Sequence, residues 1–406
     1  MVDEKINQCL PETIDFLKNL ISIPSLSGNE EKEIQFIYEA FQPLTDKIEL
    51  VPLSDKIKSD PDYSTPILDL QYRGRHNIRA VMKGTEDGRT VLFNTHADIV
   101  PAQPSQFDPL VENGAIYGRG ACDAKGQIAT LYLLLCLLKQ EKIRLRGDII
   151  IHIVVEEENG GNGTLSAIRK GEQADVAIVM EPTSLKILSS VRGAVWFRVN
   201  TSGKPGHSGS GGKRISAMDL AIEAKQILSG YHQKLLAASK GIPLFDAYEN
   251  PMPITFGKLH AGDWPATIPK HGALEGVLGF LPNKNRYQIM EEISNEIEDK
   301  GSEELKTNFN LEFMYRHDAH VLPVNHPLVA TLYQSCEKAK LPAEITAMVA
   351  SCDSWFYNNQ LNIPTVVFGA GDLAVAHSDH EHIKISDLEL AARALLNFLL
   401  DWCNNT

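Results

Sequence analysis

The chain has 406 residues, which is enough for two or more domains with buried cores. Hydrophobic residues make up 43% and charged residues 22%, the balance of an ordinary globular protein. The formal net charge of −13, from 39 Lys and Arg against 52 Asp and Glu, argues against nonspecific binding to nucleic acid, which needs a basic surface.

Three features of the sequence indicate the cellular compartment. The first residues, MVDEKINQ, lack the apolar core of a signal peptide. The longest apolar run, at 128–138, has about half the length that a transmembrane helix needs. Six cysteines are scattered along the chain without a CxxC pair. We therefore expect a cytoplasmic protein with reduced thiols and no membrane segment.

The first part of the chain alternates helical and strand patterns. Apolar residues at helical spacing predict two helices within residues 6–41, separated by the turn IPSLSGNE. A further helix, at 126–140, lies between the second and third of four short apolar strands, which are predicted at 77–84, 90–96, 147–156 and 176–181. Strands that alternate with helices indicate a layered α/β domain.

The pattern changes after Glu181. A strand with a period of two, an amphipathic helix, a strand, a second helix and a last strand follow one another, at 189–203, 214–231, 267–282, 286–300 and 311–318. This run predicts a small separate domain inserted into the α/β domain, whose pattern then resumes. The expected boundaries are 1–189 and 317–406 for the α/β domain and 190–316 for the insert.

Side chains that bind metals gather at the ends of the predicted strands. Each cluster alone is common at a protein surface, but all of them follow or flank strands of one α/β sheet, and such sheets bind ligands at the carboxyl ends of their strands. In a His-x-Asp pair on a strand, both side chains face the same side, so one can bind a metal while the other orients it. The clusters are His96 with Asp98, Asp123, Glu157 with Glu158, Glu181, and His377 with His380 and His382.

The order of these motifs resembles the M20 metallopeptidase family, which includes acetylornithine deacetylase, succinyl-diaminopimelate desuccinylase and related carboxypeptidases. The motifs are, in order, His-x-Asp, GRGACDAKG, EEENGGNGT, EPT, GHSG and AHSDHE, and the resemblance spans about residues 15–400. It implies a three-layer α/β catalytic domain of the zinc-exopeptidase type. It also implies that the insert is a ferredoxin-like α+β domain that acts as a lid and a dimerisation domain.

The same resemblance implies a site for two divalent metal ions, most often zinc, with cobalt and manganese as alternatives. Carried over by position, His96 and Glu181 match the ligands of one ion, and Glu158 and His377 match those of the other. Asp123 matches the carboxylate that bridges both ions. The residue types agree with this independently, since imidazoles and carboxylates suit catalytic zinc.

Three further residues match catalytic positions of the family. Asp98 matches the partner of the ligand histidine, and Glu157 matches the general base, which takes a proton from water and delivers it to the leaving nitrogen. His207, in GKPGHSG, is by itself typical of a surface loop. The resemblance implies that it reaches from one subunit into the active site of the other, stabilises the oxyanion there, and so requires a homodimer.

The insert departs from the family pattern at one point. Thr267 stands before the Ile-Pro step where members commonly have asparagine, and no arginine follows until Arg286. That arginine helps family members to bind the substrate carboxylate, so the residue with this function stays open here. Arg192 and Lys270 are candidates, with a surface charge as the alternative for each. Asp353, in SCDSWF, lies either near the metals or in a buried structural turn.

We interpret the chain as a metal-dependent hydrolase that cleaves an amide bond in a small N-acyl amino acid or short peptide, most similar to acetylornithine deacetylase. A dipeptidase or carboxypeptidase of the same family is the first alternative. An oxidoreductase is a second, because residues 369–374 fit a dinucleotide fingerprint, although a histidine-rich segment follows in place of a helix and strand. A non-catalytic relative is a third, although such proteins usually lose ligands.

Overall fold

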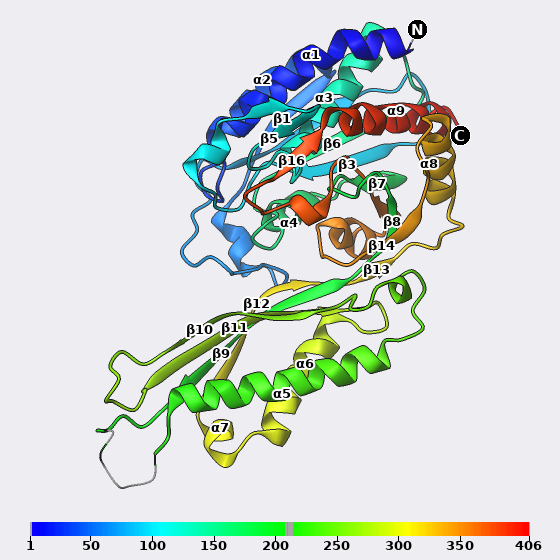
Figure 1. Ribbon diagram of the computed structural model, residues 1–406. Coiled ribbons are helices and arrows are strands. Elements are labelled where there is room, and N and C mark those ends of the chain that lie inside the picture. The colour runs from blue at the N-terminus through cyan, green and yellow to red at the C-terminus, as the bar shows by residue number, and fades with distance from the viewer. Residues whose placement is uncertain (1, 208, 210–213, 406) are drawn as a thin grey trace.

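The computed structural model describes residues 2–207, 209 and 214–405, which form a larger and a smaller body (Figure 1). The larger body contains a mixed sheet of nine strands, in the order β1-β2-β6-β3-β7-β15-β8-β13 with β14 beside β8. These strands are β1 (Lys47–Pro52), β2 (His76–Met82), β3 (Val91–His96), β6 (Ile149–Val154), β7 (Val176–Val179), β8 (Ile187–Val191), β13 (His320–Val321), β14 (Ile345–Met348) and β15 (Thr365–Val367).

The centre of the large sheet consists of parallel strands that are buried on both faces. β3 pairs in parallel with both β6 and β7, and β15 pairs in parallel with β7. Every residue of these four strands is buried, which explains why they read as nearly continuous apolar runs in the sequence. Because the strands are parallel, the segments that follow them emerge at one edge of the sheet.

Helices cover the large sheet. Figure 1 shows α1, α3 and α9 above it and α4 below it. The helices of this body are α1 (Val2–Ile21), α2 (Glu31–Phe41), α3 (Lys125–Gln140), α4 (Asn162–Ile168), α8 (Pro327–Lys338) and α9 (Ile385–Trp402). Residues 125–138 of α3 are all buried, because α3 packs against α1, α9 and β3. The long apolar run of the sequence is therefore a core helix, and no helix in the described part of the chain is long and apolar enough to cross a membrane.

The smaller body has the ferredoxin-like fold that the sequence resemblance implies. Its elements are β9 (Gly193–Ser202), α5 (Ala217–Ala238), β10 (Ile254–Ala261), β11 (His271–Phe280), α6 (Arg286–Lys300), α7 (Glu303–Thr307) and β12 (Phe309–His317). The sheet order is β10-β11-β9-β12, with every pair antiparallel. Strand β10 is missing from the sequence prediction. It is a mostly exposed edge strand with an irregularity at 256–258, so its apolar pattern is weak.

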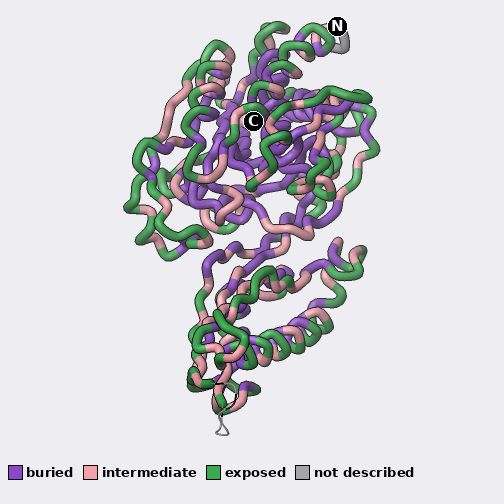
Figure 2. Tube along the Cα trace, turned by 60° about the vertical axis from the view of Figure 1, so that its left-hand side comes forward, coloured by how far each residue is buried: buried purple, intermediate pink, exposed green. Residues whose placement is uncertain are grey.

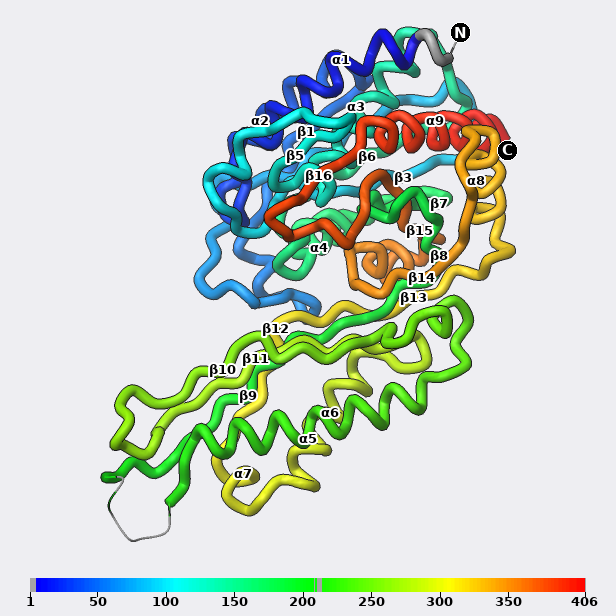
Figure 3. The backbone as a smooth tube through the Cα atoms, in the orientation of Figure 1, coloured from blue at the N-terminus to red at the C-terminus, as the bar shows by residue number. Residues whose placement is uncertain are grey.

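The chain enters and leaves the smaller body at one place. Ala194 at the start of β9 pairs with His317 at the end of β12, and the tube of Figure 3 shows the two crossings side by side. Each body has its own apolar core, and Figure 2 shows the buried segments concentrated in the larger one. On these grounds we propose 190–316 as the inserted domain, between catalytic segments 1–189 and 317–406.

A small third sheet connects two motif-bearing segments. It contains β4 (Leu110–Glu112), β5 (Ala115–Tyr117) and β16 (His382–Lys384), in the order β16-β5-β4. Tyr117 pairs with His382, so the start of GRGACDAKG lies beside the end of AHSDHEH. This pairing holds the loops of Asp123 and His377 next to each other.

Candidate metal centre and active site

The five side chains matched to metal ligands lie together beyond the carboxyl ends of the parallel strands. His96 ends β3, Glu158 lies in the turn after β6, and Glu181 follows β7. Asp123 lies just before α3, and His377 lies in the loop after β15. They form two donor groups, His96 with Asp123 and Glu181, and Asp123 with Glu158 and His377, in each of which the donor atoms lie within 4.8 Å of one another.

Asp123 belongs to both donor groups and faces an imidazole with each oxygen. Its Oδ1 lies 3.1 Å from Nε2 of His96, and its Oδ2 lies 3.2 Å from Nε2 of His377. The His96 nitrogen also lies 3.9 Å from Glu181 Oε2, and the His377 nitrogen 2.9 Å from Glu158 Oε1. A carboxylate between two such groups has the arrangement that a bridging ligand needs.

Asp98 connects the end of β3 to the turn after β6. Nδ1 of His96 lies 2.9 Å from the Asp98 carbonyl oxygen and 3.6 Å from its Oδ1. The buried Asp98 carboxylate also accepts hydrogen bonds from the amides of Glu157, at 3.0 Å, and Glu158, at 3.2 Å. Because Nδ1 is engaged by Asp98, the ring is oriented with Nε2 toward the donor groups.

The carboxylates of this region repel one another and are poorly solvated. Burial, with the negative charge of Asp353, raises the pKa of Glu157 well above its ordinary range. Burial also raises the pKa of Glu181 well above its ordinary range, and burial with the charge of Asp123 raises that of Glu158 to about 7. Buried carboxylates of this kind need compensating positive charge when they are ionised.

The two histidines supply part of that charge. Burial alone would raise the pKa of Asp123, but hydrogen bonds from His377 and His96 outweigh it and hold the pKa below its ordinary range. The same contacts to Asp123 and Glu158 raise the pKa of His377 to about 10. Two imidazoles and several crowded carboxylates are a donor set that fits two divalent ions, since buried charges need a partner or a metal.

Glu157 belongs to neither donor group, but its charge interacts with those of Glu181, His96 and Glu158, so it lies close to both groups. It follows Glu156 in a turn and is partly exposed. A carboxylate that is close to a metal centre and free of it can accept a proton from water. This is the position that a general base requires.

Glu156, the first glutamate of the EEENGGNGT motif, has a different environment. It is buried and bonded to Arg75, Tyr72 and Asn162, so it does not face solvent. The sequence carries no signal for this pairing, because the burial of Arg75 is visible only in the structure.

His207 lies away from the donor groups of its own chain. It is exposed, pairs with Thr267 in an isolated bridge, and its Nδ1 accepts a hydrogen bond of 3.0 Å from the Gly209 amide. These residues follow β9 and precede β11, at the end of the smaller body that points away from the large sheet (Figure 1). Ser208 and residues 210–213 of this loop lie outside the described part of the chain.

The other candidates fall in contrasting places. Lys270 is exposed, as a surface charge would be. Arg192 is not a surface charge: its Nε donates to the Val349 carbonyl, its Nη1 is buried without a hydrogen-bond partner in the described structure, and burial lowers its pKa to about 10. Asp353 is fully buried, accepts the Thr164 hydroxyl at 2.6 Å, and lies against Gly161, so it is both in a buried turn and beside the site.

The segment that fits a dinucleotide fingerprint does not have the required fold. Only a short 3-10 helix, Leu373–Val375, follows its glycines, and the loop then continues to His377. A side chain at Gly369 would collide with Gln127 and with the carbonyl of Glu181. These glycines therefore serve close packing around the donor groups and do not open a helix toward a pyrophosphate.

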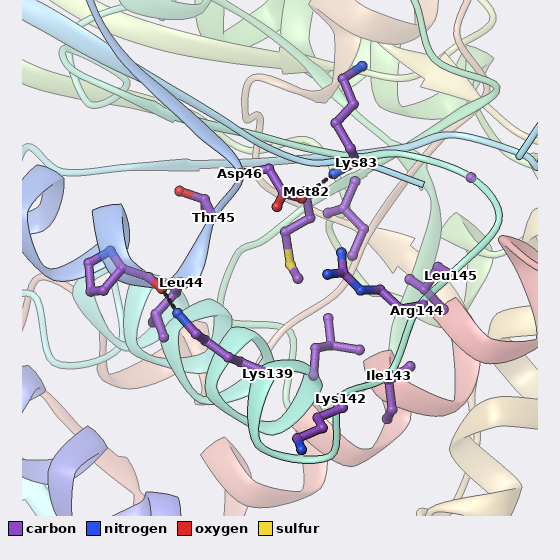
Figure 4. Close-up of a pocket in the computed structure, with 14 residues that line it drawn as sticks. Leu44, Thr45, Asp46, Met82, Lys83, Lys139, Lys142, Ile143, Arg144 and Leu145 are labelled. Atoms are coloured by element: carbon purple, nitrogen blue, oxygen red, sulfur yellow. Dashed lines mark hydrogen bonds between the residues drawn. The ribbon is translucent and has the colours of Figure 1, made fainter. Parts of the chain in front are cut away.

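A cavity of about 360 Å³ lies at the other end of β6, between the segment before β1, the end of β2 and the end of α3. The cavity is lined by Ile149, the first residue of β6, whereas Glu156, Glu157 and Glu158 come after the opposite end of that strand. Figure 4 shows Lys139 directed to the carbonyl of Pro43 and Arg144 directed toward Met82. The cavity contains none of the candidate residues and is separate from the site.

Comparisons with known proteins agree with this geometry. Residues 92–401 match the family described as peptidase family M20/M25/M40. The chain is 28% identical, over 366 residues, to N-formyl-4-amino-5-aminomethyl-2-methylpyrimidine deformylase of Bacillus subtilis, covering 82% of this chain and 84% of that protein. It is 24% identical to acetylornithine deacetylase of Proteus mirabilis, covering 98% of each. A solved di-peptidase from Saccharomyces cerevisiae shares the fold, with a TM-score of 0.81 and 15% identity over 100% of this chain and 98% of that one.

Proposed function

The chain belongs to peptidase family M20/M25/M40 as a metal-dependent amidohydrolase, and on that premise we propose that it removes a small acyl group from an N-acyl amino compound. One observation carries the proposal. Two donor groups share Asp123, and Glu157 lies beside both of them without belonging to either. A dipeptidase or carboxypeptidase activity is the second candidate, supported by the shared fold of the yeast di-peptidase.

In this proposal the donor groups hold two divalent ions, with zinc first and cobalt or manganese as alternatives. His96, Asp123 and Glu181 would hold one ion, and Asp123, Glu158 and His377 would hold the other. When bound, such ions polarise a substrate carbonyl and lower the pKa of bound water toward about 7. Asp98 orients the His96 ring and fixes the backbone of the turn that carries Glu157 and Glu158.

Glu157 then transfers the proton. It takes a proton from the attacking water and delivers it to the leaving nitrogen, so that the amine departs neutral. A carboxylate bound to a metal could not do this equally well, because its lone pairs would be engaged.

We further propose that the protein is a homodimer in which His207 completes the partner's site. The exposure of His207 and its place at the far end of the smaller body support this, because it lies away from the donor groups of its own chain. An imidazole N–H is a suitable donor to the oxygen that becomes negative when water adds to the carbonyl.

Mixed dimers test the placement of His207. His207→Ala and Glu157→Gln should each be nearly inactive, but a 1:1 mixture after subunit exchange should recover about a quarter of the wild-type rate, since half of the dimers then hold one complete site. The rate would be measured before and after exchange, with mass spectrometry to verify the mixed dimer. A mixture that stays inactive although mixed dimers form would show that His207 does not serve the partner's site.

The substrate class is tested by a panel of amides with the zinc- or cobalt-loaded enzyme. We expect N-formyl and N-acetyl amino compounds to be hydrolysed with a kcat/KM at least about tenfold above that of dipeptides. A difference of one methylene group in how a substrate fits its pocket already changes kcat/KM by about tenfold or more. The relatives named as deformylase and deacetylase match most of the chain in sequence, whereas the di-peptidase supports the fold alone. Dipeptides as the faster substrates would favour the second candidate.

A further inference from the structure

The turn that carries the proposed base begins at Glu156, which the proposed chemistry does not use. Glu156 has a φ of 68°, in the left-handed region that non-glycine residues rarely adopt. Only 1% of its surface is exposed. Such a conformation persists where the surrounding contacts determine it, and it often marks a functional constraint.

Both oxygens of the Glu156 carboxylate are engaged. Oε2 lies 3.0 Å from Nη1 of Arg75, and Oε1 lies 2.9 Å from the Tyr72 hydroxyl and 2.9 Å from Nδ2 of Asn162. Arg75 is itself held by Glu30, through its Nε at 3.0 Å and through its Nη2. The partners are all buried, so these contacts are shielded from water and stronger than surface pairs.

The contacts of Glu156 and Asn162 brace the turn at both ends. Asn162 is the first residue of α4, and it accepts from the Ser64 amide at 2.9 Å and donates to the Ser64 carbonyl at 2.9 Å. Glu156 and Asn162 are also bonded to each other, so the turn closes on itself. Between these ends lie Glu157 and Glu158, whose amides are fixed by Asp98.

We propose that Glu156 is a positioning residue for the general base. Its bonds to Arg75, Tyr72 and Asn162 hold the backbone of residues 156–162, and this direction of the backbone aims the Glu157 carboxylate at the attacking water and the leaving nitrogen. The inference rests on the proposed role of Glu157. It assigns to Glu156, the first of the three consecutive glutamates, a function in geometry rather than in proton transfer or metal binding.

The alternative is that the buried ion pair only stabilises the fold, and a matched pair of variants separates the two. Glu156→Gln keeps the size of the side chain but turns an N–H donor toward Arg75. Glu172→Gln makes the same change at a glutamate in the loop before β7, which is bonded to Arg79 at 2.5 Å and to His152 at 3.2 Å and lies outside the turn. Both variants lose an arginine pair, but only Glu156 lies in the turn that carries the proposed base.

For Glu156→Gln we expect kcat to fall by about 10- to 100-fold, since a misplacement of about 1 Å can cost this much, with KM within about twofold and unchanged metal content. For Glu172→Gln we expect kcat within about twofold of wild type, whatever its melting temperature. Tyr72→Phe removes one hydroxyl from the network and should give an intermediate loss of kcat of about two- to fivefold, in a protein that keeps the Arg75 pair. Kinetics, metal analysis and melting curves would be recorded for all three.

Equal kcat values for Glu156→Gln and Glu172→Gln would overturn the inference, and so would loss of metal from Glu156→Gln, because Glu156 would then act through the ligand Glu158. A wild-type kcat in Tyr72→Phe would also contradict the inference. If Glu156→Gln does not fold, the Tyr72→Phe result decides the question. A Glu157→Gln variant with normal turnover would instead remove the proposed base. The two failures are therefore distinguishable.

Discussion

Replacing Glu157 by glutamine is expected to lower kcat by about 10²- to 10⁴-fold, the usual contribution of a positioned general base. Glutamine has the size of glutamate but does not take up a proton at neutral pH. Since Glu157 lies outside both donor groups, the metal content should stay at the wild-type level. Single-turnover kinetics and metal analysis of the same preparation would measure both effects.

The neighbouring glutamate supplies the contrast for this experiment. Glu158 lies 2.9 Å from the His377 imidazole in one donor group, so Glu158→Gln should lose metal together with activity. Intact turnover in Glu157→Gln would show that Glu157 is not the general base. Loss of metal from that variant would instead make Glu157 a ligand, and the roles of two adjacent glutamates would have to be exchanged.

The elements that are predictable from the sequence are those whose burial is simple. α3 and the parallel strands β3, β6 and β7 are buried all round, so they appear as apolar runs with clear limits. The strands absent from the sequence prediction, such as β10 and β4, are short or exposed edges without a regular apolar pattern. Their pairing depends on neighbours distant in sequence and not on their own residues.

The grouping of the donor side chains is predictable for a physical reason. Parallel strands place their carboxyl ends at one edge, so motifs that follow successive strands must meet there whatever their distance in sequence. The pairing of Glu156 with Arg75 has no such rule, because the two are 81 residues apart and meet through a loop. Whether His207 serves the site of a second subunit, as we propose, depends on a second chain, about which a single sequence holds no direct information.

Removal of both metal ions is expected to lower the melting temperature by roughly 10 to 20 °C. Each tightly bound ion stabilises the folded protein by about 2.7 kcal/mol at 100 times its Kd, and a large domain shifts by about 2–4 °C for each kcal/mol. The cause is local. Without cations, Glu157, Glu158 and Glu181 remain as crowded carboxylates beside Asp123. Melting curves with and without a chelator, followed by addition of zinc, would measure the difference.

The difference should also widen as the pH rises from 5 to 8. The folded pKa of Glu158, about 7, lies above its ordinary value of 4.5, so in the metal-free protein its stabilising effect is present below pH 4.5 and is lost as the pH rises through 7. Glu157 and Glu181 shift in the same direction. Asp123 has a lowered pKa and stays ionised throughout this range, so it adds no slope. Bound cations remove the loss, and metal binding itself strengthens as the ligands lose protons.

A variant that lacks one metal-binding side chain separates the loss of stability on metal removal from any general action of the chelator. His96→Asn removes one imidazole from a donor group, so its melting temperature should respond less to the chelator than that of the wild type, and its dependence on pH should resemble that of the metal-free protein. Equal melting temperatures of the wild type with and without chelator at pH 8 would contradict the whole scheme. The crowded carboxylates would then not destabilise the metal-free protein, and their negative charge would no longer be an argument for two metal ions.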